Sequence, residues 1–276
     1  MKFSRIALVA ASLVASVIRA TIAAPQPPSP QVQPLPNAHA HNDYEHSRPL
    51  LDALDQGFCS VEADIYLVDD RLLVAHDRPK VHPDRTLEAL YLDPLLARVK
   101  AHGGRVYPGG PPVTLLVDIK ADAEATYARL EQVLAKYRSM LTVFRTDRTE
   151  TNAVTVILSG DRPWKTMAAQ SERLAALDGR LPDLDSNPSP HLVPLVSDNW
   201  RTHFRWNGAD AMPDAELAKL RSLVAKAHAQ GRRIRFWAAA DRPEVWSVHA
   251  AEGVDFVNTD RLAELAAFLK NRPARP

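Results

Sequence analysis

The feature that most constrains the fold is the alternation of short apolar runs with helical stretches along about 240 residues. Strands are predicted at 35–41, 60–68, 71–76, 113–119, 154–158, 192–196, 234–239 and 254–257, with an edge strand at 141–144. Helices are predicted at 48–56, 86–102, 123–137, 164–177, 214–230, 242–251 and 260–270. This alternation predicts a single-domain (β/α)8 TIM barrel. A doubly wound open sheet is the competing architecture, although no G-x-G-x-x-G or P-loop follows any strand.

The N-terminal residues have a different composition from the rest of the chain. A basic start precedes an apolar run at 6–18, and small residues follow up to Ala24. This layout predicts a secretory signal peptide at 1–24, because the apolar run is too short to span a bilayer comfortably. An uncleaved anchor is the alternative. We therefore expect export to the periplasm or beyond the cell.

The stretch 25–36 is rich in proline and is predicted to be an extended linker before the barrel domain at 37–272. Without residues 1–24 the chain has 31 basic side chains against 33 acidic ones, a balance that does not indicate a nucleic-acid surface. The single cysteine, Cys59, cannot form an intramolecular disulfide and is expected to be a small buried hydrophobe. No obligate protein partner is indicated.

Acidic residues interrupt two otherwise apolar strands. Glu62 and Asp64 lie two apart on strand 60–68 and therefore face the same side, and Asp118 lies within the apolar strand 113–119. Charges on buried strands are costly unless they are paired or bound to a metal. We expect the three carboxylates to converge at the carboxyl ends of the strands and to bind one Mg²⁺ or Ca²⁺ ion.

Histidines lie next to the strand ends that carry these acids. His39 and His76 are the candidates for an acid–base pair, because imidazole titrates near neutrality and cleavage of a phosphodiester requires both a base and an acid. Lys120 would add positive charge to the transition state. The sequence therefore predicts metal-dependent cleavage of a phosphodiester.

These motifs resemble those of the glycerophosphodiester phosphodiesterase family, within the superfamily of phospholipase-C-like barrels. That family has a first strand with a catalytic His, then Gly-x-x-x-x-Glu-x-Asp, an acidic turn and a strand ending in His-Asp. Here the matching residues are His39, then Gly57 with Glu62 and Asp64, then His76 with Asp77. The phrase HAHNDYEHSRPLLDAL is most similar to the branch of altered-inheritance-of-mitochondria-type proteins.

The resemblance implies His39 and His76 as acid and base, with Glu62, Asp64 and Asp118 as the metal ligands. It also implies that the substrate contacts Asn42 and Lys120, and the strand-end residues Trp237 and Asn258 are further candidates. His41 and Asp77 are secondary candidates. The usual His-Arg-Gly is replaced here by His39-Ala40-His41-Asn42, a form similar to the sphingomyelinase D branch, which leaves the substrate open. Both hydrolysis and formation of a cyclic phosphate occur among such enzymes.

Two other functions fit parts of the pattern. His39-x-His41 also opens metal-dependent amidohydrolases, in which Asp260 would be a ligand, but His191 would lie at the wrong end of its strand. An exported barrel that binds a phosphodiester without turnover is the second alternative. A phospholipid substrate would also involve transient contact with a membrane surface, for which the aromatic candidates are Tyr44, Tyr107, Trp164, Trp200 and Trp206.

Overall fold

The computed structural model describes residues 32–272, so the predicted signal peptide and most of the predicted linker lie outside the described residues. Eight parallel strands form the main sheet in the order β11-β10-β9-β7-β4-β2-β1-β12. Their bounds are β1 Leu35–Ala40, β2 Phe58–Val68, β4 Val113–Ile119, β7 Val154–Gly160, β9 Ala175–Gly179, β10 Leu195–Asn199, β11 Arg233–Trp237 and β12 Val257–Thr259. A parallel bridge between Arg235 and Phe256 joins the two ends of the sheet. The fold is therefore the predicted (β/α)8 barrel.

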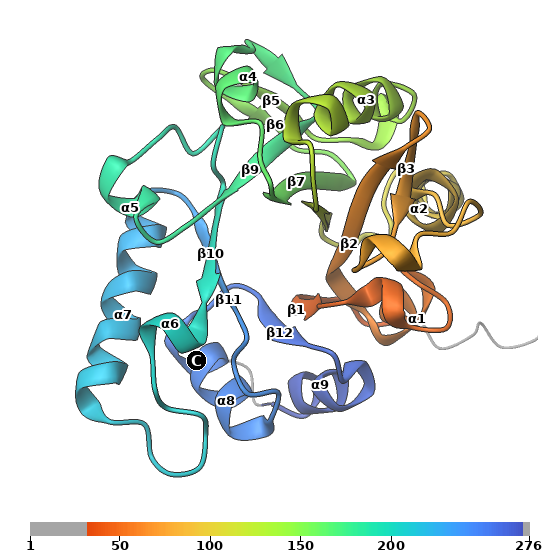
Figure 1. Cartoon of the computed structure of the whole chain (residues 1–276). Coiled ribbons are helices and arrows are strands. Elements are labelled where there is room, and N and C mark those ends of the chain that lie inside the picture. The colour runs from red at the N-terminus through yellow and green to blue at the C-terminus, as the bar shows by residue number, and fades with distance from the viewer. Residues whose placement is uncertain (1–31, 273–276) are drawn as a thin grey trace, which may run out of the picture. The chain divides into compact units, whose positions relative to one another are not determined.

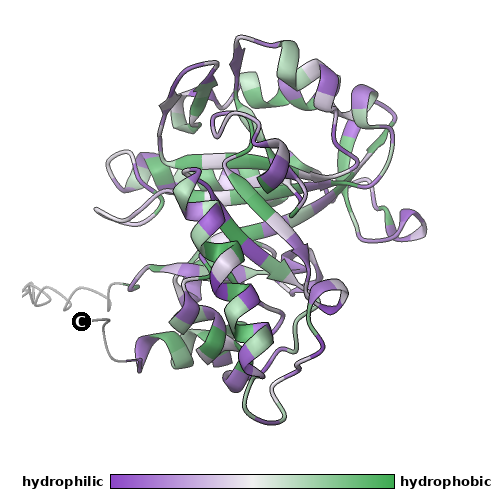
Figure 2. Cartoon of the chain, turned by 90° about the vertical axis from the view of Figure 1, so that its left-hand side faces the viewer, coloured by the Kyte–Doolittle hydropathy of each residue, from purple (hydrophilic) through white to green (hydrophobic). Residues whose placement is uncertain are grey.

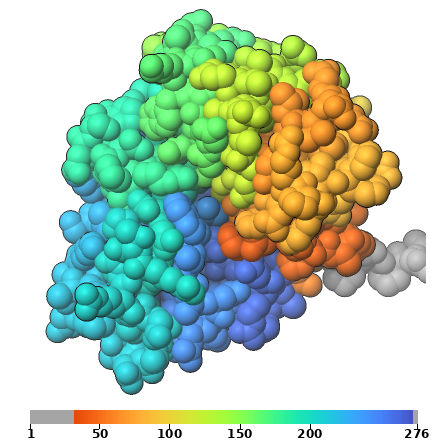
Figure 3. Space-filling model, viewed as in Figure 1, coloured from red at the N-terminus to blue at the C-terminus, as the bar shows by residue number. Residues whose placement is uncertain are grey.

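A helix follows each barrel strand and lies outside the ring of strands (Figure 1). The helices are α1 Leu51–Gln56, α2 Asp93–Ala101, α3 Ala123–Ala135, α4 Trp164–Ala169, α5 Asp183–Ser186, α6 Trp200–His203, α7 Asp214–Ala229, α8 Pro243–Glu252 and α9 Leu262–Lys270. Short turns of other helix types occur at Asp43–Glu45, Arg78–Lys80, Glu88–Leu92 and Arg138–Met140. β1 and β12 pair in parallel, so that the two ends of the barrel sequence lie side by side (Figure 3).

Two small additions extend the barrel. β3 (Arg71–Val74) pairs antiparallel with the end of β2 and carries the chain toward His76. The strands β5 (Val143–Arg145), β6 (Thr149–Glu150) and β8 (Glu172–Arg173) form a separate three-stranded sheet. The edge strand predicted at 141–144 contributes Val143 and Phe144 to this small sheet, while Leu141 forms an isolated parallel bridge with Val154 of β7.

The prediction of one helix at 164–177 is wrong. α4 ends at Ala169, and Ala175–Gly179 is a fifth consecutive barrel strand, β9. The segment is a short run of Leu and Ala, whose length and pattern fit a buried strand as well as a helix. The sequence prediction therefore missed one strand of the barrel, β9, and with it Asp178 and the adjacent Arg180.

The barrel strands are nearly continuous apolar runs because both of their faces are covered. Figure 2 shows mostly hydrophobic strands and helices that carry hydrophilic residues. The main core lies between strands and helices, where the buried side chains include Cys59, as expected. A second cluster contains Leu116, Ile157, Leu195 and Phe256. Because side chains alternate along strands, these residues face the barrel interior and separate its two ends.

Candidate active site

Three carboxylates meet where β2 and β4 lie side by side. Asp64 and Asp118 are direct partners in the register of these two strands, and Glu62 precedes Asp64 by two residues on the same face. One oxygen from each of the three side chains lies within 4.8 Å of the others. Glu62 and Asp64 are buried and Asp118 is half-buried. The three carboxylates therefore converge in the structure, as expected from the sequence.

The charges of the acidic cluster are only partly compensated. Lys120 Nζ lies 2.7 Å from Asp64 Oδ2 and 3.0 Å from Asp118 Oδ1. Burial and the charge of Glu62 nevertheless raise the pKa of Asp64 to about 6, and burial raises the pKa of Asp118. Asp64 Oδ1 is buried and has no hydrogen-bond partner. Oxygen ligands with excess negative charge and an unpaired oxygen fit a hard divalent cation.

His76 lies at one side of the acidic cluster, two residues after β3. Its Nδ1 lies 2.9 Å from Asp64 Oδ2 and 3.0 Å from the hydroxyl of Tyr44. The carboxylate accepts the Nδ1 proton, which leaves Nε2 as the atom able to exchange protons with a substrate. About half of the side chain, 52%, is exposed. His76 is therefore oriented by the cluster and accessible to a ligand.

His41 lies at the other side, directly after β1. Its Nδ1 lies 2.7 Å from Asp260 Oδ1, and its Nε2 lies 3.8 Å from Glu62 Oε2. Burial alone would lower the pKa of His41, but the hydrogen bond to Asp260 and the negative charges of Glu62 and Asp260 raise it above the ordinary value. The side chain is 26% exposed, so the ring is accessible from the mouth of the barrel.

His39 has a different environment, inside the barrel. Its Nδ1 lies 2.7 Å from Ser60 Oγ, and the guanidinium of Arg235 donates to its Nε2. Burial first, and then the charge of Arg235, lower the pKa of His39 well below its ordinary value. The ring is therefore neutral, and both nitrogens already have partners in the protein. The neutral ring of His39 also packs beneath the acidic cluster, with its Nε2 4.0 Å from Glu62 Oε2.

Asn42 connects the two sides of the site. It adopts a left-handed conformation with φ of 50°, which asparagine tolerates better than most residues, and its N–H donates to Glu62 Oε2 at 3.3 Å. Tyr44 donates its hydroxyl proton to Asn42 Oδ1 at 2.6 Å, and Asn42 Nδ2 donates to Asp260. Asn42 thus has protein partners at the position predicted to contact a substrate.

The remaining predicted residues fall into two groups. Asn258 Oδ1 accepts a hydrogen bond from Arg235 at 3.2 Å, and Trp237 lies at the mouth of the barrel, with the Arg180 guanidinium 4.8 Å from its ring centre. Asp77 does not join the acidic cluster, since its side chain is half-exposed and lies 3.0 Å from Lys80 Nζ. The structure therefore brings together all the predicted residues except Asp77.

Sequence analysis missed a second polar cluster on β9. Asp178 Oδ2 accepts hydrogen bonds from Ser159 Oγ, Ser197 Oγ and Arg180, and Asp178 Oδ1 is buried without a partner. It also missed Arg235, which is buried. The alternation R-I-R-F-W on β11 places Arg233, Arg235 and Trp237 on one face, and this was the available signal.

The aromatic residues proposed for membrane contact are mostly buried. Tyr44, Tyr107 and Trp200 are each no more than 3% exposed, Trp206 is 9% exposed, and Trp164 is half-buried. Trp200 stacks on Phe204 with ring centres 4.0 Å apart. They pack within the domain and form no exposed apolar surface. Within residues 32–272, no helix is long and apolar enough to cross a membrane.

The site does not match the amidohydrolase alternative. His191 precedes β10 and lies at the opposite end of the barrel from the acidic cluster, and His203 pairs with Asp198 at 3.3 Å. The interior positions near the ends of β9, β10 and β11 carry Asp178, Ser197 and Arg235 instead of metal-binding histidines.

Comparisons with known proteins agree with this assignment of the fold. A family model described as an AIM6-like phosphodiesterase domain matches residues 29–177. "Altered inheritance of mitochondria protein 6" of Lachancea thermotolerans is 32% identical over 85% of this chain. Its homolog in Arthroderma benhamiae is 26% identical over 83% of this chain and 82% of its own length. The chain spans 66% of the length of the Lachancea relative.

A solved structure supports the fold alone. The crystal structure of a glycerophosphodiester phosphodiesterase from Parabacteroides distasonis aligns with 85% of this chain and 96% of its own, at 16% identity and a TM-score of 0.52. The family match assigns this barrel to the phosphodiesterase class. Within this class, the chain belongs to the family of AIM6-like phosphodiesterase domains.

Proposed function

We propose that the chain cleaves a phosphodiester of the glycerophosphodiester or phospholipid type, with one Mg²⁺ or Ca²⁺ ion held by Glu62, Asp64 and Asp118. The observation that carries the proposal is the acidic cluster with its unpaired, buried Asp64 Oδ1 and a histidine on each side. The bound ion would neutralise charge on the phosphoryl group.

Two histidines on opposite sides of the carboxylates supply the proton transfers in this proposal. His76 has its Nδ1 held by Asp64 and Tyr44, and His41 has its Nδ1 held by Asp260, so each ring presents Nε2. One ring removes the proton of the attacking hydroxyl, and the other protonates the departing oxygen. The sequence placed the first histidine at His39. Because the ring of His39 is buried and both of its nitrogens have partners, we assign His39 a positioning role beneath Glu62. In this proposal His41 has the catalytic role instead.

Positive side chains at the mouth would hold the negatively charged substrate. Lys120 reaches the acidic cluster, while Arg180 and Arg162 approach from the β9 side, where Arg162 donates to the Asp178 carbonyl. These charges would stabilise the additional negative charge of the transition state. A cavity of about 190 Å³ beside His76, lined also by Lys80 and Arg85, offers room for a polar group of the substrate.

The attacking group is either water or a hydroxyl of the substrate, and the second case gives a cyclic phosphate. Binding of a diester without turnover remains the second function. The histidine–carboxylate contacts favour catalysis, because a site used only for binding has no need of an oriented, accessible imidazole such as His76. We also propose export through the N-terminal segment 1–24, which a cell-fractionation experiment tests.

A substrate panel tests the proposed reaction. The purified chain is incubated with glycerophosphodiesters, sphingomyelin, lysophospholipids and a chromogenic diester, each with Mg²⁺, with Ca²⁺ and with chelator. We expect turnover of at least one diester that disappears with chelator and in Glu62→Ala. Phosphorus NMR of the products separates hydrolysis from cyclisation. Tight binding of a diester by the metal-loaded chain without any product would instead support the non-catalytic barrel.

A further inference from the structure

A large cavity lies at the opposite end of the barrel from the acidic cluster. It has a volume of about 640 Å³, within the range of small-molecule sites. Its lining comes from the amino-terminal ends of the strands and from the small sheet, with Asn37 of β1, Thr155 of β7, Arg233 of β11 and Phe256 before β12. The interior cluster that contains Phe256 separates it from the active site.

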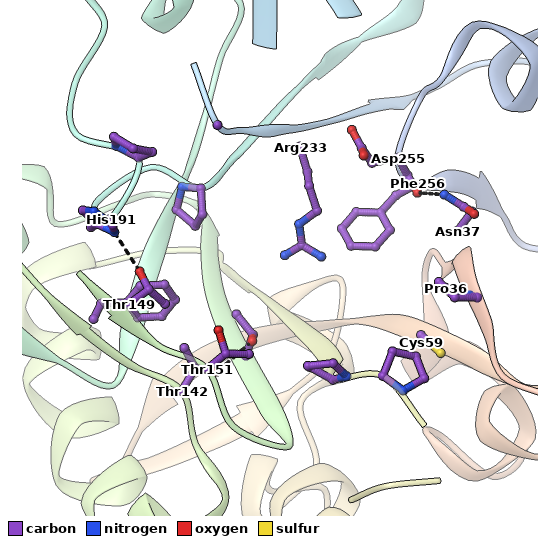
Figure 4. A pocket seen from close by; sticks show the side chains of 17 residues that line it. Pro36, Asn37, Cys59, Thr142, Thr149, Thr151, His191, Arg233, Asp255 and Phe256 are labelled. Atoms are coloured by element: carbon purple, nitrogen blue, oxygen red, sulfur yellow. Dashed lines mark hydrogen bonds between the residues drawn. The ribbon is translucent and has the colours of Figure 1, made fainter. Parts of the chain in front are cut away.

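Arg233 is the arginine of this cavity, and the Asp255 carboxylate also belongs to its lining. Figure 4 shows its guanidinium extending from β11 into the open space, with Phe256 at one side and the threonines of the small sheet at the other. The guanidinium lies 4.6 Å from the ring centre of Phe256, and its Nη1 donates to Thr114 Oγ1 at 3.3 Å. No other hydrogen bond of this side chain occurs with residues 32–272, although a guanidinium has five N–H donors.

The carboxylate nearest to Arg233 is already in use. Asp255 Oδ2 accepts the Ile234 N–H at 2.8 Å and lies 2.9 Å from His228 Nε2. Among residues 32–272, no carboxylate forms a salt bridge with Arg233. Burial lowers the pKa of Arg233, and the negative charge of Asp255 opposes this effect. Because the guanidinium forms one hydrogen bond and no salt bridge with residues 32–272, it can pair with an anion of one negative charge.

The other walls of the cavity define the body of the ligand. Most of the lining is rigid and apolar, and its prolines have no N–H to donate. These residues are the prolines at 36, 111, 112, 190 and 194 and the rings of Phe144 and Phe256. Polar groups are placed at one side, where Thr149 Oγ1 lies 2.9 Å from His191 Nδ1 and Thr151 stands at the exposed rim. The lining therefore fits a small organic anion with one charged end and an apolar remainder.

We propose that this cavity is a second binding site, which takes a small monocarboxylate with an apolar body through Arg233. The carboxylate pairs with the guanidinium, and the apolar body contacts Phe256 and the prolines. This site is separate from the phosphodiester site and does not depend on the reaction proposed above. Phosphate esters share the anionic end of such a ligand, and they form a separate arm of the test.

Ligand-detected NMR titrations of the full chain test the proposal. The probes are benzoate and hexanoate, with benzyl alcohol and benzylamine as the uncharged and cationic counterparts of benzoate, and phenyl phosphate and inorganic phosphate as the other anions. We expect benzoate and hexanoate to bind at least tenfold more tightly than benzyl alcohol or benzylamine. Equal binding of benzyl alcohol, or binding of both phosphate probes without either carboxylate, would overturn the proposal.

Variants locate the site. Arg233→Met keeps an unbranched chain in place of the arginine stem and removes the guanidinium charge, and we expect it to weaken benzoate binding at least tenfold. Arg148→Met is the matched control, because it removes one exposed arginine charge, paired with Glu150, from the nearby small sheet. Thr151→Trp fills the cavity from its rim without touching the arginine, so it tests the site even if Arg233→Met fails to fold. Unchanged benzoate binding in Thr151→Trp would place the ligand elsewhere and contradict the proposal.

Discussion

His39 and His41 lie on the same face of β1, two residues apart, yet their rings have opposite properties. Arg235 and Ser60 occupy both nitrogens of His39, which is fully buried, whereas His41 is accessible and lies against Glu62 and Asp260. At this scale the chemistry depends on the partner of each ring and not on its place in a motif. The motif H-x-H alone could not distinguish the two residues.

Substitution of each histidine should separate these roles. We expect His41→Ala and His76→Ala to lower kcat/KM for the best diester by about 100-fold or more with little change in Tm. His39→Ala leaves Arg235 and Ser60 without their partner and should lower the free energy of unfolding by about 1 to 3 kcal/mol. Steady-state kinetics and thermal unfolding give both quantities. An inactive His39→Ala of normal Tm beside a fully active His41→Ala would restore His39 to the catalytic role.

Asp43 should make the free energy of unfolding depend on pH. It is buried, accepts hydrogen bonds from the Leu50 N–H and the Tyr91 hydroxyl, and has a pKa raised by burial from 3.8 to about 7. The folded chain therefore binds more protons than the unfolded chain between these values, and its unfolding free energy falls as pH rises through this window. The fall due to Asp43 is at most about 4 kcal/mol.

Denaturant unfolding in chelator at pH 4 to 8 measures this effect. Asp43→Asn cannot ionise, so its unfolding free energy should fall less with rising pH than that of the wild-type chain. Asp64 and Asp118, whose pKa values are also raised, remain in both proteins and cancel in the comparison. Parallel curves for the two proteins would show that Asp43 is not the titrating group.

At the scale of elements, the ends of β4 and β7 position the acidic cluster. Gly160 ends β7 with a φ of 69°, and a Cβ there would lie 2.5 Å from Asp118 Oδ1 and would also collide with the Ile119 carbonyl. Only glycine has both the backbone conformation and the space that this position requires. Asp118 on β4, the proposed metal ligand, thus has its position constrained by the end of β7.

Gly160→Ala should therefore damage both stability and the metal site. We expect a loss of about 2 to 4 kcal/mol in the free energy of unfolding, from the strained backbone and the collision together, and weaker binding of the divalent ion. Gly109→Ala is the matched control, since Gly109 has a φ of 63° but no atom within 4 Å of the added Cβ. It should lose only about 1 kcal/mol. Equal losses in the two variants would show that the contact with Asp118 has no effect.

The elements also show why some of the site could be predicted and some could not. Glu62, Asp64 and Asp118 interrupt strands that are otherwise apolar, and this local contrast is visible in the sequence. Asp178 was not predicted because it follows a short run of Leu and Ala that fits a helix as well as a strand. This run forms a strand because it pairs with its neighbours β7 and β10. Arg235, the partner of His39 Nε2, lies 196 residues away along the chain, a separation for which no local pattern exists.

At the scale of the whole molecule, the barrel separates two kinds of site. One end carries the acidic cluster, its histidines and Lys120, and the other carries the cavity around Arg233. The apolar layer of Leu116, Ile157, Leu195 and Phe256 lies between them. The length of the chain and its alternation of apolar and helical stretches predicted the barrel. The cavity at the amino-terminal end was not predicted, because it is formed by prolines and a small sheet whose positions only the structure provides.

The most direct test of the account is the turnover of a phosphodiester as a function of the free divalent ion concentration. After treatment with chelator, we predict that the wild-type chain is inactive and that Mg²⁺ or Ca²⁺ restores turnover along a saturable curve. Asp118→Asn should need at least tenfold more ion, while Asp77→Asn, the matched control outside the cluster, should follow the wild-type curve. Full turnover in chelator, or the same curve for Asp118→Asn as for the wild type, would contradict the assignment of the acidic cluster as the metal site of a phosphodiesterase.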